Sequence, residues 1–85
     1  MLSLAIMAVE PISFTPSANI QAITYDADTQ TLLVRFHRGG RLYRYVEVTG
    51  EEAYGFGQAL SANDYLQTRI LPAHPGEAVN ENTNG

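Results

Sequence analysis

The chain has 85 residues, of which 45% are hydrophobic, and its five basic and nine acidic residues give a formal charge of −4. This length accommodates one small domain, and the composition is typical of a folded rather than a disordered chain. The negative charge disfavours broad, non-specific attraction to nucleic acid. The absence of cysteine excludes a disulfide framework and thiolate chemistry, and it suits a cytoplasmic protein.

Residues 1–16 are expected to form a lead-in to the domain. The stretch 1–9 is apolar, but it has neither the basic segment nor the small-residue cleavage pattern of a signal peptide, and it is too short to cross a membrane. Met7 is an alternative start site. An additional strand over 9–14 is restricted to a sheet edge, because Pro11 lacks a backbone donor.

Three strands are expected over residues 19–25, 32–37 and 42–48, where apolar, β-branched and aromatic residues alternate with polar ones. Residues 26–30, between the first two strands, are expected to form a turn, because Asp and Thr side chains can form hydrogen bonds with their own nearby backbone. Gly39-Gly40 predicts a two-residue hairpin turn between the second and third strands. The strands therefore form an antiparallel meander of three, or four with the N-terminal edge strand.

The expected turns fix the register. A two-residue loop places Arg38 opposite Arg41 and Arg35 opposite Arg44. One face of the sheet then carries a core set: Leu32, Val34, Phe36, Tyr43 and Tyr45. A first turn centred on residues 28–29 adds Ile23 and Tyr25 to this face, opposite Val34 and Leu32. The other face is mixed: Ala22, Thr24, Leu33, Arg35, Leu42, Arg44 and Val46.

A first short helix is expected after the strands. Thr49 followed by Glu52 is a capping-box pattern, in which each side chain bonds the backbone of the other residue. Ala53, Phe56 and Leu60 then recur at spacings of three and four, as one apolar stripe of a helix.

A second short helix is indicated by another capping pattern, Ser61 followed by Asp64. Its helically spaced residues are Tyr65, Leu66, Arg69 and Ile70, and Pro72 ends it. The sequence therefore predicts an α+β fold in which both helices pack on the aromatic face of the sheet. Residues 72–85 are polar and rich in Asn, and they are expected to form a flexible tail.

The order of these features resembles a known family. Residues 17–26 (SANIQAITYD) precede Leu32-x-Val34-x-Phe36, Gly40, Tyr43-x-Tyr45, and finally Ala59-x-Ser61 with Tyr65 and Ile70. This series resembles the KTSC domain, a short module also found at the C-terminus of some lysyl-tRNA synthetases. The resemblance assigns residues 17–71 to the domain and implies a small stand-alone protein of bacterial or phage type. It suggests RNA binding through the synthetase context and offers no catalytic residues. Ala18 stands where a serine is usual in the family.

Four of the five basic residues are arginines close together in the predicted hairpin: Arg35, Arg38, Arg41 and Arg44. The planar guanidinium group binds phosphates and carboxylates in a bidentate manner. Arg35 directly across from Arg44 would be mildly destabilising, unless a phosphate or a partner lies between them. Alternatively, Thr24, Asp26 or Glu52 supplies the counter-charge within the fold, or the two guanidinium groups extend apart into solvent.

Two further candidates lie in the same hairpin. Tyr43 and Tyr45 match the family's central motif, but they share the core face and point away from Arg35 and Arg44. We therefore expect them to be core residues rather than a base-stacking platform. His37 lies near the turn as a surface residue that adds to the binding hairpin. It has no partner with which to bind a metal.

The leading hypothesis is a small, non-enzymatic binding module in a nucleic-acid-related process, which binds RNA through the arginine hairpin. The alternative is a protein-binding regulator of phage or bacterial type that docks on an acidic surface of a larger machine such as RNA polymerase. No cofactor, metal or membrane is expected, and the chain is expected to be a monomer or a weak homodimer.

Overall fold

The computed structural model describes residues 9–80. The five strands are β1 (Val9–Pro11), β2 (Ile20–Asp26), β3 (Thr31–Phe36), β4 (Leu42–Tyr45) and β5 (Glu77–Ala78). The helical segments are the 3-10 turn η2 (Arg38–Gly40), α1 (Gly50–Gln58), α2 (Ala62–Tyr65) and the π-helical turn η3 (Leu66–Ile70) that continues α2. The expectations for residues 1–8, including the start at Met7, lie outside the described residues.

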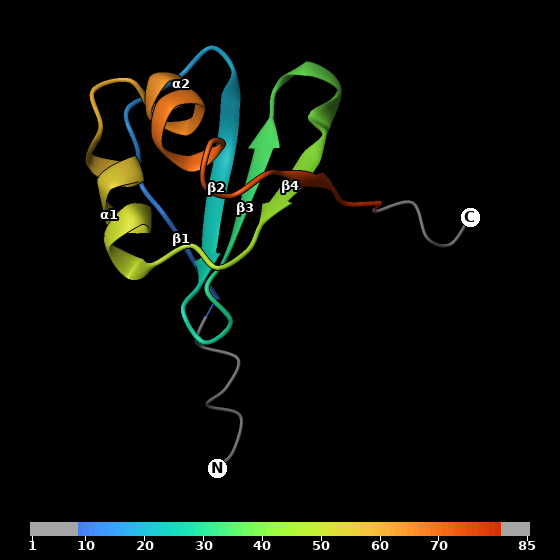
Figure 1. Ribbon diagram of the computed structural model, residues 1–85. Helices are drawn as coiled ribbons and strands as arrows, with labels where there is room; N and C mark the ends of the chain where they lie inside the picture. The colour runs from blue at the N-terminus through green and yellow to red at the C-terminus, as the bar shows by residue number, and fades with distance from the viewer. Residues whose placement is uncertain (1–8, 81–85) are drawn as a thin grey trace.

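The strands form one antiparallel sheet in the order β1-β2-β3-β4-β5, and α1 and α2 lie together over one face of it (Figure 1). The expected α+β meander with helices on one face is therefore confirmed, but the described chain has five strands where three or four were expected. The edge strand containing Pro11 is β1, which pairs with β2.

The first hairpin has the expected register. Ile23 pairs with Val34, and Tyr25 pairs with Leu32. At the start of β2 the register shifts by a β-bulge between Ile20 and Ala22, and this bulge allows Ile20 and Ile23, three positions apart, to be buried on the same side.

The second hairpin differs from the expected one. Its turn spans residues 37–40 and is closed by the Phe36 N–H, which donates to the Arg41 carbonyl at 2.8 Å. The reason is that residues 38–40 form a 3-10 turn, in which the Gly40 N–H donates to the His37 carbonyl at 3.3 Å, so the loop holds four residues rather than two. The His37 N–H points to the other side and donates to the Asn19 carbonyl at 2.9 Å. Gly39 and Gly40 still have the expected positive φ angles of 71° and 61°.

The predicted pairing of Arg35 with Arg44 is therefore wrong. Arg35 pairs with Leu42, and Arg44 pairs with Leu33. The register is displaced by two positions, and an even displacement keeps every side chain on its expected face. Val34, opposite Tyr43, still belongs to the core face.

Helix α1 begins with the predicted capping box. The Thr49 hydroxyl accepts from the Glu52 N–H at 3.1 Å, and the Glu52 carboxylate accepts from the Thr49 N–H at 2.9 Å. The expected apolar stripe is shorter than predicted, because the backbone becomes extended at Ala59 and leaves Leu60 94% exposed.

The core lies between the helices and the sheet. Its buried side chains are Ile20, Ile23, Leu32, Val34, Tyr45, Val48, Ala53, Phe56, Ala62, Leu66 and Ile70. Ser61 caps α2 as predicted, accepting from the Asp64 N–H at 3.2 Å. Glycine in α1 permits close packing, because a Cβ on Gly55 would lie 2.4 Å from the Tyr65 hydroxyl. The Tyr65 ring in turn stacks on Phe56 at a centroid distance of 5.8 Å.

Residues 72–80, expected as part of a flexible tail, are instead folded onto the domain. Tyr43 pairs with Ala78 and Arg44 with Glu77, and the Val79 N–H donates to the Leu42 carbonyl at 2.8 Å. The strand β5 thereby covers the edge of β4, which would otherwise expose unpaired backbone groups. Figure 1 shows this segment running from the helices past β3 to β4.

Candidate functional site

A cavity of about 650 Å³ lies between the tip of the β3–β4 hairpin and the start of α2. We call it the tip cavity. Its lining residues are of three kinds: the aromatic residues Phe36 and Tyr43, the cations Arg38 and Arg41, and the amides Asn19, Asn63 and Gln67, with Ala18 and Gly39 completing the wall. No acidic residue lines it, so the tip cavity is locally cationic in an acidic chain.

The floor of the tip cavity is aromatic. Phe36 and Tyr43 lie on the helix-facing side of the sheet and contact each other edge to face, with centroids 5.6 Å apart and an interplanar angle of 83°. Both side chains are only partly buried, at the border of the core. Tyr45, by contrast, is 2% exposed and belongs to the core as expected, and burial, followed by the neighbouring Tyr43, raises the pKa of its hydroxyl.

Arg38 and Arg41 are exposed, and within residues 9–80 neither guanidinium group has an ion pair or a hydrogen bond. Both line the tip cavity beside Phe36 and Tyr43. The expected separation of the arginines from Tyr43 therefore holds for only half of the cluster. Two guanidinium groups and two aromatic rings share one site.

Arg35 and Arg44 have structural contacts on the opposite, helix-free face. Arg35 donates to the Gly40 carbonyl at 2.7 Å and so braces the turn. Arg44 lies 3.2 Å from the carboxylate of Glu77 on β5. Its counter-charge thus comes from the segment expected to be a tail rather than from Asp26 or Glu52.

The family model for the KTSC domain matches residues 16–73. The chain belongs to the KTSC domain family. The fold of this KTSC domain is similar to a crystal structure of a KTSC domain protein from Yersinia pestis, with a TM-score of 0.74 and 23% identity over 86% of this chain and 100% of that chain. A search of the curated proteins found no match.

His37 does not line the tip cavity of the KTSC domain. Its side chain is exposed, and its backbone bond to Asn19 holds the segment before β2 beside the hairpin tip. Sequence reasoning missed the three amides. Asn63 and Gln67 carried a usable signal, because residues four apart share one face of a helix. Asn19 carried none, since its position depends on a contact between distant segments.

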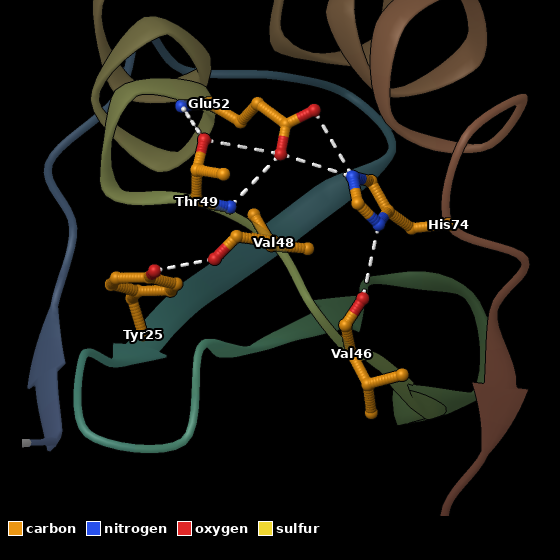
Figure 2. Close-up of polar contacts among 6 residues, drawn as sticks. All are labelled: Tyr25, Val46, Val48, Thr49, Glu52 and His74. Atoms are coloured by element: carbon orange, nitrogen blue, oxygen red, sulfur yellow. Dashed lines mark hydrogen bonds and ion pairs between the residues drawn. The ribbon is translucent and has the colours of Figure 1, made fainter.

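Sequence reasoning also missed a clasp formed by His74 and Glu52 (Figure 2). The His74 Nδ1 lies 3.0 Å from the Val46 carbonyl, and its Nε2 lies 3.0 Å from both oxygens of the Glu52 carboxylate. Its two ring nitrogens therefore face two separate acceptor groups, one from the backbone and one from α1. The clasp fastens the segment before β5 to α1 and to the end of β4.

Glu52 therefore serves both the helix cap and the clasp. The N–H of Thr49 and, after it, His74 lower the pKa of Glu52, against an opposing effect of burial. Beside it, the Tyr25 hydroxyl donates to the Val48 carbonyl (Figure 2). Burial raises the pKa of Tyr25, with smaller contributions from the Glu52 and Asp26 carboxylates.

Among the described residues of the KTSC domain, no three His, Cys, Asp or Glu side chains gather closely enough to hold a metal ion. None of the helices in the described range is long and apolar enough to cross a membrane.

Proposed function

We propose that this KTSC domain is a non-enzymatic binding module for single-stranded RNA, which it holds in the tip cavity, and that it acts in the cytoplasm. The observation that supports the proposal is the cavity lining itself. Arg38 and Arg41 lack ion pairs within the described chain and stand beside two partly exposed aromatic rings, with no acidic side chain among them.

Each part of the lining suits a different part of a nucleotide. A guanidinium group binds phosphate through paired hydrogen bonds. The exposed surfaces of Phe36 and Tyr43 suit an unstacked base, and such bases occur in single-stranded RNA rather than in a duplex. The amides of Asn63 and Gln67 carry both donors and acceptors, which can reach the hydrogen-bonding edge of a base.

The size and charge of the site favour a short ligand. Cavities of about 300–1,000 Å³ typically enclose ligands of small-molecule size, and the tip cavity measures about 650 Å³. The chain's formal charge of −4 opposes a long electrostatic footprint on a nucleic acid. We therefore expect contact with few nucleotides.

The alternative is docking on an acidic protein surface. The same Arg38 and Arg41 would pair with carboxylates, but such a partner would leave the aromatic floor without a role. RNA binding uses both features, and we propose it for that reason.

The test is fluorescence anisotropy with a labelled, mixed-sequence RNA strand of about eight nucleotides, titrated over a series of salt concentrations. Arg38→Ala and Arg41→Ala should each weaken binding and reduce the slope of log K against log salt by about 0.7. Arg69→Ala is the charge-matched control, because Arg69 is exposed and does not line the tip cavity.

Equal losses in all three variants would show a mere dependence on net charge and would refute the proposal. So would the absence of RNA binding at low salt. A pull-down after nuclease treatment covers the alternative: recovery of one protein partner that depends on Arg38 and Arg41 would favour docking on an acidic surface.

A further inference from the structure

A second hollow of about 290 Å³ adjoins the tip cavity. The two share three wall residues: Phe36, Tyr43 and Gln67. The remaining walls of the second hollow are Tyr45, Leu66, Leu71 and Gly76, and we call it the annex. Because the hollows share the aromatic floor and one helix residue, they lie side by side between the sheet and the helical segment 62–71, and together we call them the groove.

The two ends of this groove differ in chemistry. The tip cavity carries two arginines, whereas no charged residue lines the annex. Tyr45 and Leu66 are almost fully buried beneath the annex, at 2% and 1% exposure. A ligand that fills the groove therefore has an anionic end and an uncharged, flat or apolar end.

The outer wall of the annex is the segment around Gly76. A Cβ on Gly76 would lie 2.6 Å from the Tyr45 ring, so the backbone rests directly against that ring. Two residues earlier, His74 is fastened to Glu52 and Val46 (Figure 2). The clasp thus holds the wall of the annex but touches no residue of the tip cavity.

We propose that the groove holds two consecutive RNA nucleotides, with the phosphates at Arg38 and Arg41 and the second base in the annex. This inference rests on the proposed function and adds a subsite to it. A base suits the annex, because it is flat, uncharged and able to lie against tyrosine and leucine side chains. The sugar-phosphate link between the two nucleotides would pass the residues that the hollows share, Phe36, Tyr43 and Gln67.

The experiment is a length series of oligouridylates with a 5′-phosphate, from one to three nucleotides, measured by calorimetry or by competition at low salt. For the wild-type protein we expect the second nucleotide to strengthen binding roughly 5- to 150-fold, which corresponds to the stacking of one base. The third nucleotide should add less than about threefold, since the groove ends at the Gly76 segment.

The matched variants are Leu71→Ala and Leu60→Ala. Leu71 lines the annex, whereas Leu60 lies outside it and is 94% exposed. Leu71→Ala should lose most of the gain from the second nucleotide and keep the affinity for uridine monophosphate, and Leu60→Ala should keep both. The wild-type length series stands on its own if Leu71→Ala fails to fold.

The outcomes separate the two proposals. If RNA binds in an Arg38- and Arg41-dependent manner but one and two nucleotides bind equally, the annex subsite is wrong and the proposed function stands. A gain from the third nucleotide as large as that from the second would also overturn the two-nucleotide limit. If no oligouridylate and no mixed-sequence RNA binds at low salt, both proposals fail.

Discussion

Replacing Glu52 by alanine should destabilise the domain far more than replacing its neighbour Glu51. The Glu52 carboxylate accepts from the Thr49 N–H at 2.9 Å and from the Thr49 hydroxyl at 3.2 Å, and it lies 3.0 Å from the His74 ring. Glu51 is exposed in the first turn of α1 and contributes only through the helix dipole. The two variants remove the same charge from adjacent positions.

The magnitude follows from these contacts. Loss of a helix-capping bond typically costs about 1 kcal/mol. The hydrogen bond between Glu52 and the His74 ring adds up to about 1 kcal/mol, because the side chains of His74 and Glu52 are 11% and 29% exposed and solvent screens them in part. Glu52→Ala should therefore cost about 2 kcal/mol, which lowers the melting temperature of a domain of this size by about 10 °C. Glu51→Ala should cost about 0.5 kcal/mol.

Thermal denaturation followed by circular dichroism measures both differences, and its pH dependence carries a second signature. Because the folded state lowers the pKa of Glu52 below its ordinary value of 4.5, the stability that Glu52 contributes is present above that value and is lost as pH falls through the lowered pKa. Glu52→Gln keeps an acceptor oxygen but removes this titration. The reasoning is refuted if Glu52→Ala and Glu51→Ala have the same melting temperature. It is also refuted if Glu52→Gln loses stability between about pH 5 and pH 3 as steeply as the wild type.

Three further predictions concern the stability of the fold. Phe56→Ala should cost about 3–5 kcal/mol in urea denaturation, because Phe56 is fully buried; a loss below about 1 kcal/mol would contradict its central place in the core. Gly55→Ala should destabilise the protein although alanine favours helices, because the new Cβ meets the Tyr65 hydroxyl. Adding Tyr65→Phe removes that hydroxyl and should relieve much of the cost. If the free-energy changes of the two substitutions simply add in the double variant, this contact is not the cause. Arg44→Ala should change the free energy of unfolding by less than about 1 kcal/mol, because its ion pair with Glu77 is largely exposed; a larger loss would show that the pair is essential for docking β5.

The elements that sequence reasoning predicted well are those specified by neighbouring residues. The register of the first hairpin follows from residues 26–30, and the capping box at Thr49 and the side-chain cap at Ser61 need only a residue three positions later. The face on which each arginine lies was also predictable, because alternation along a strand survives a register change of two positions.

The features that could not be predicted depend on contacts between distant segments. The bond between His37 and Asn19 places the segment before β2 beside the hairpin tip, and a local reading of Gly39-Gly40 does not reveal it. The strand β5 has only two residues, too few for a pattern to be recognisable. His74 lies in a polar stretch whose composition indicates a tail, and its place is fixed by Glu52, 22 residues earlier. For this reason the sequence alone did not reveal that Asn19 lines the tip cavity or that Gly76 lines the annex.

The bulge at the start of β2 makes the chain unequally tolerant of changes in length. Because the bulge interrupts the alternation of side chains, Ile20 points into the core opposite Phe36. Deleting Gln21 would remove the bulge and leave Ile20 in that place, whereas an extra residue beside Gln21 would move Ile20 away from Phe36 and pull Asn19 away from the hairpin tip. An extra residue in the exposed turn 27–30 has no such effect. Related chains with the same cavity should therefore vary in length at that turn and have no longer spacing between Asn19 and Ile23.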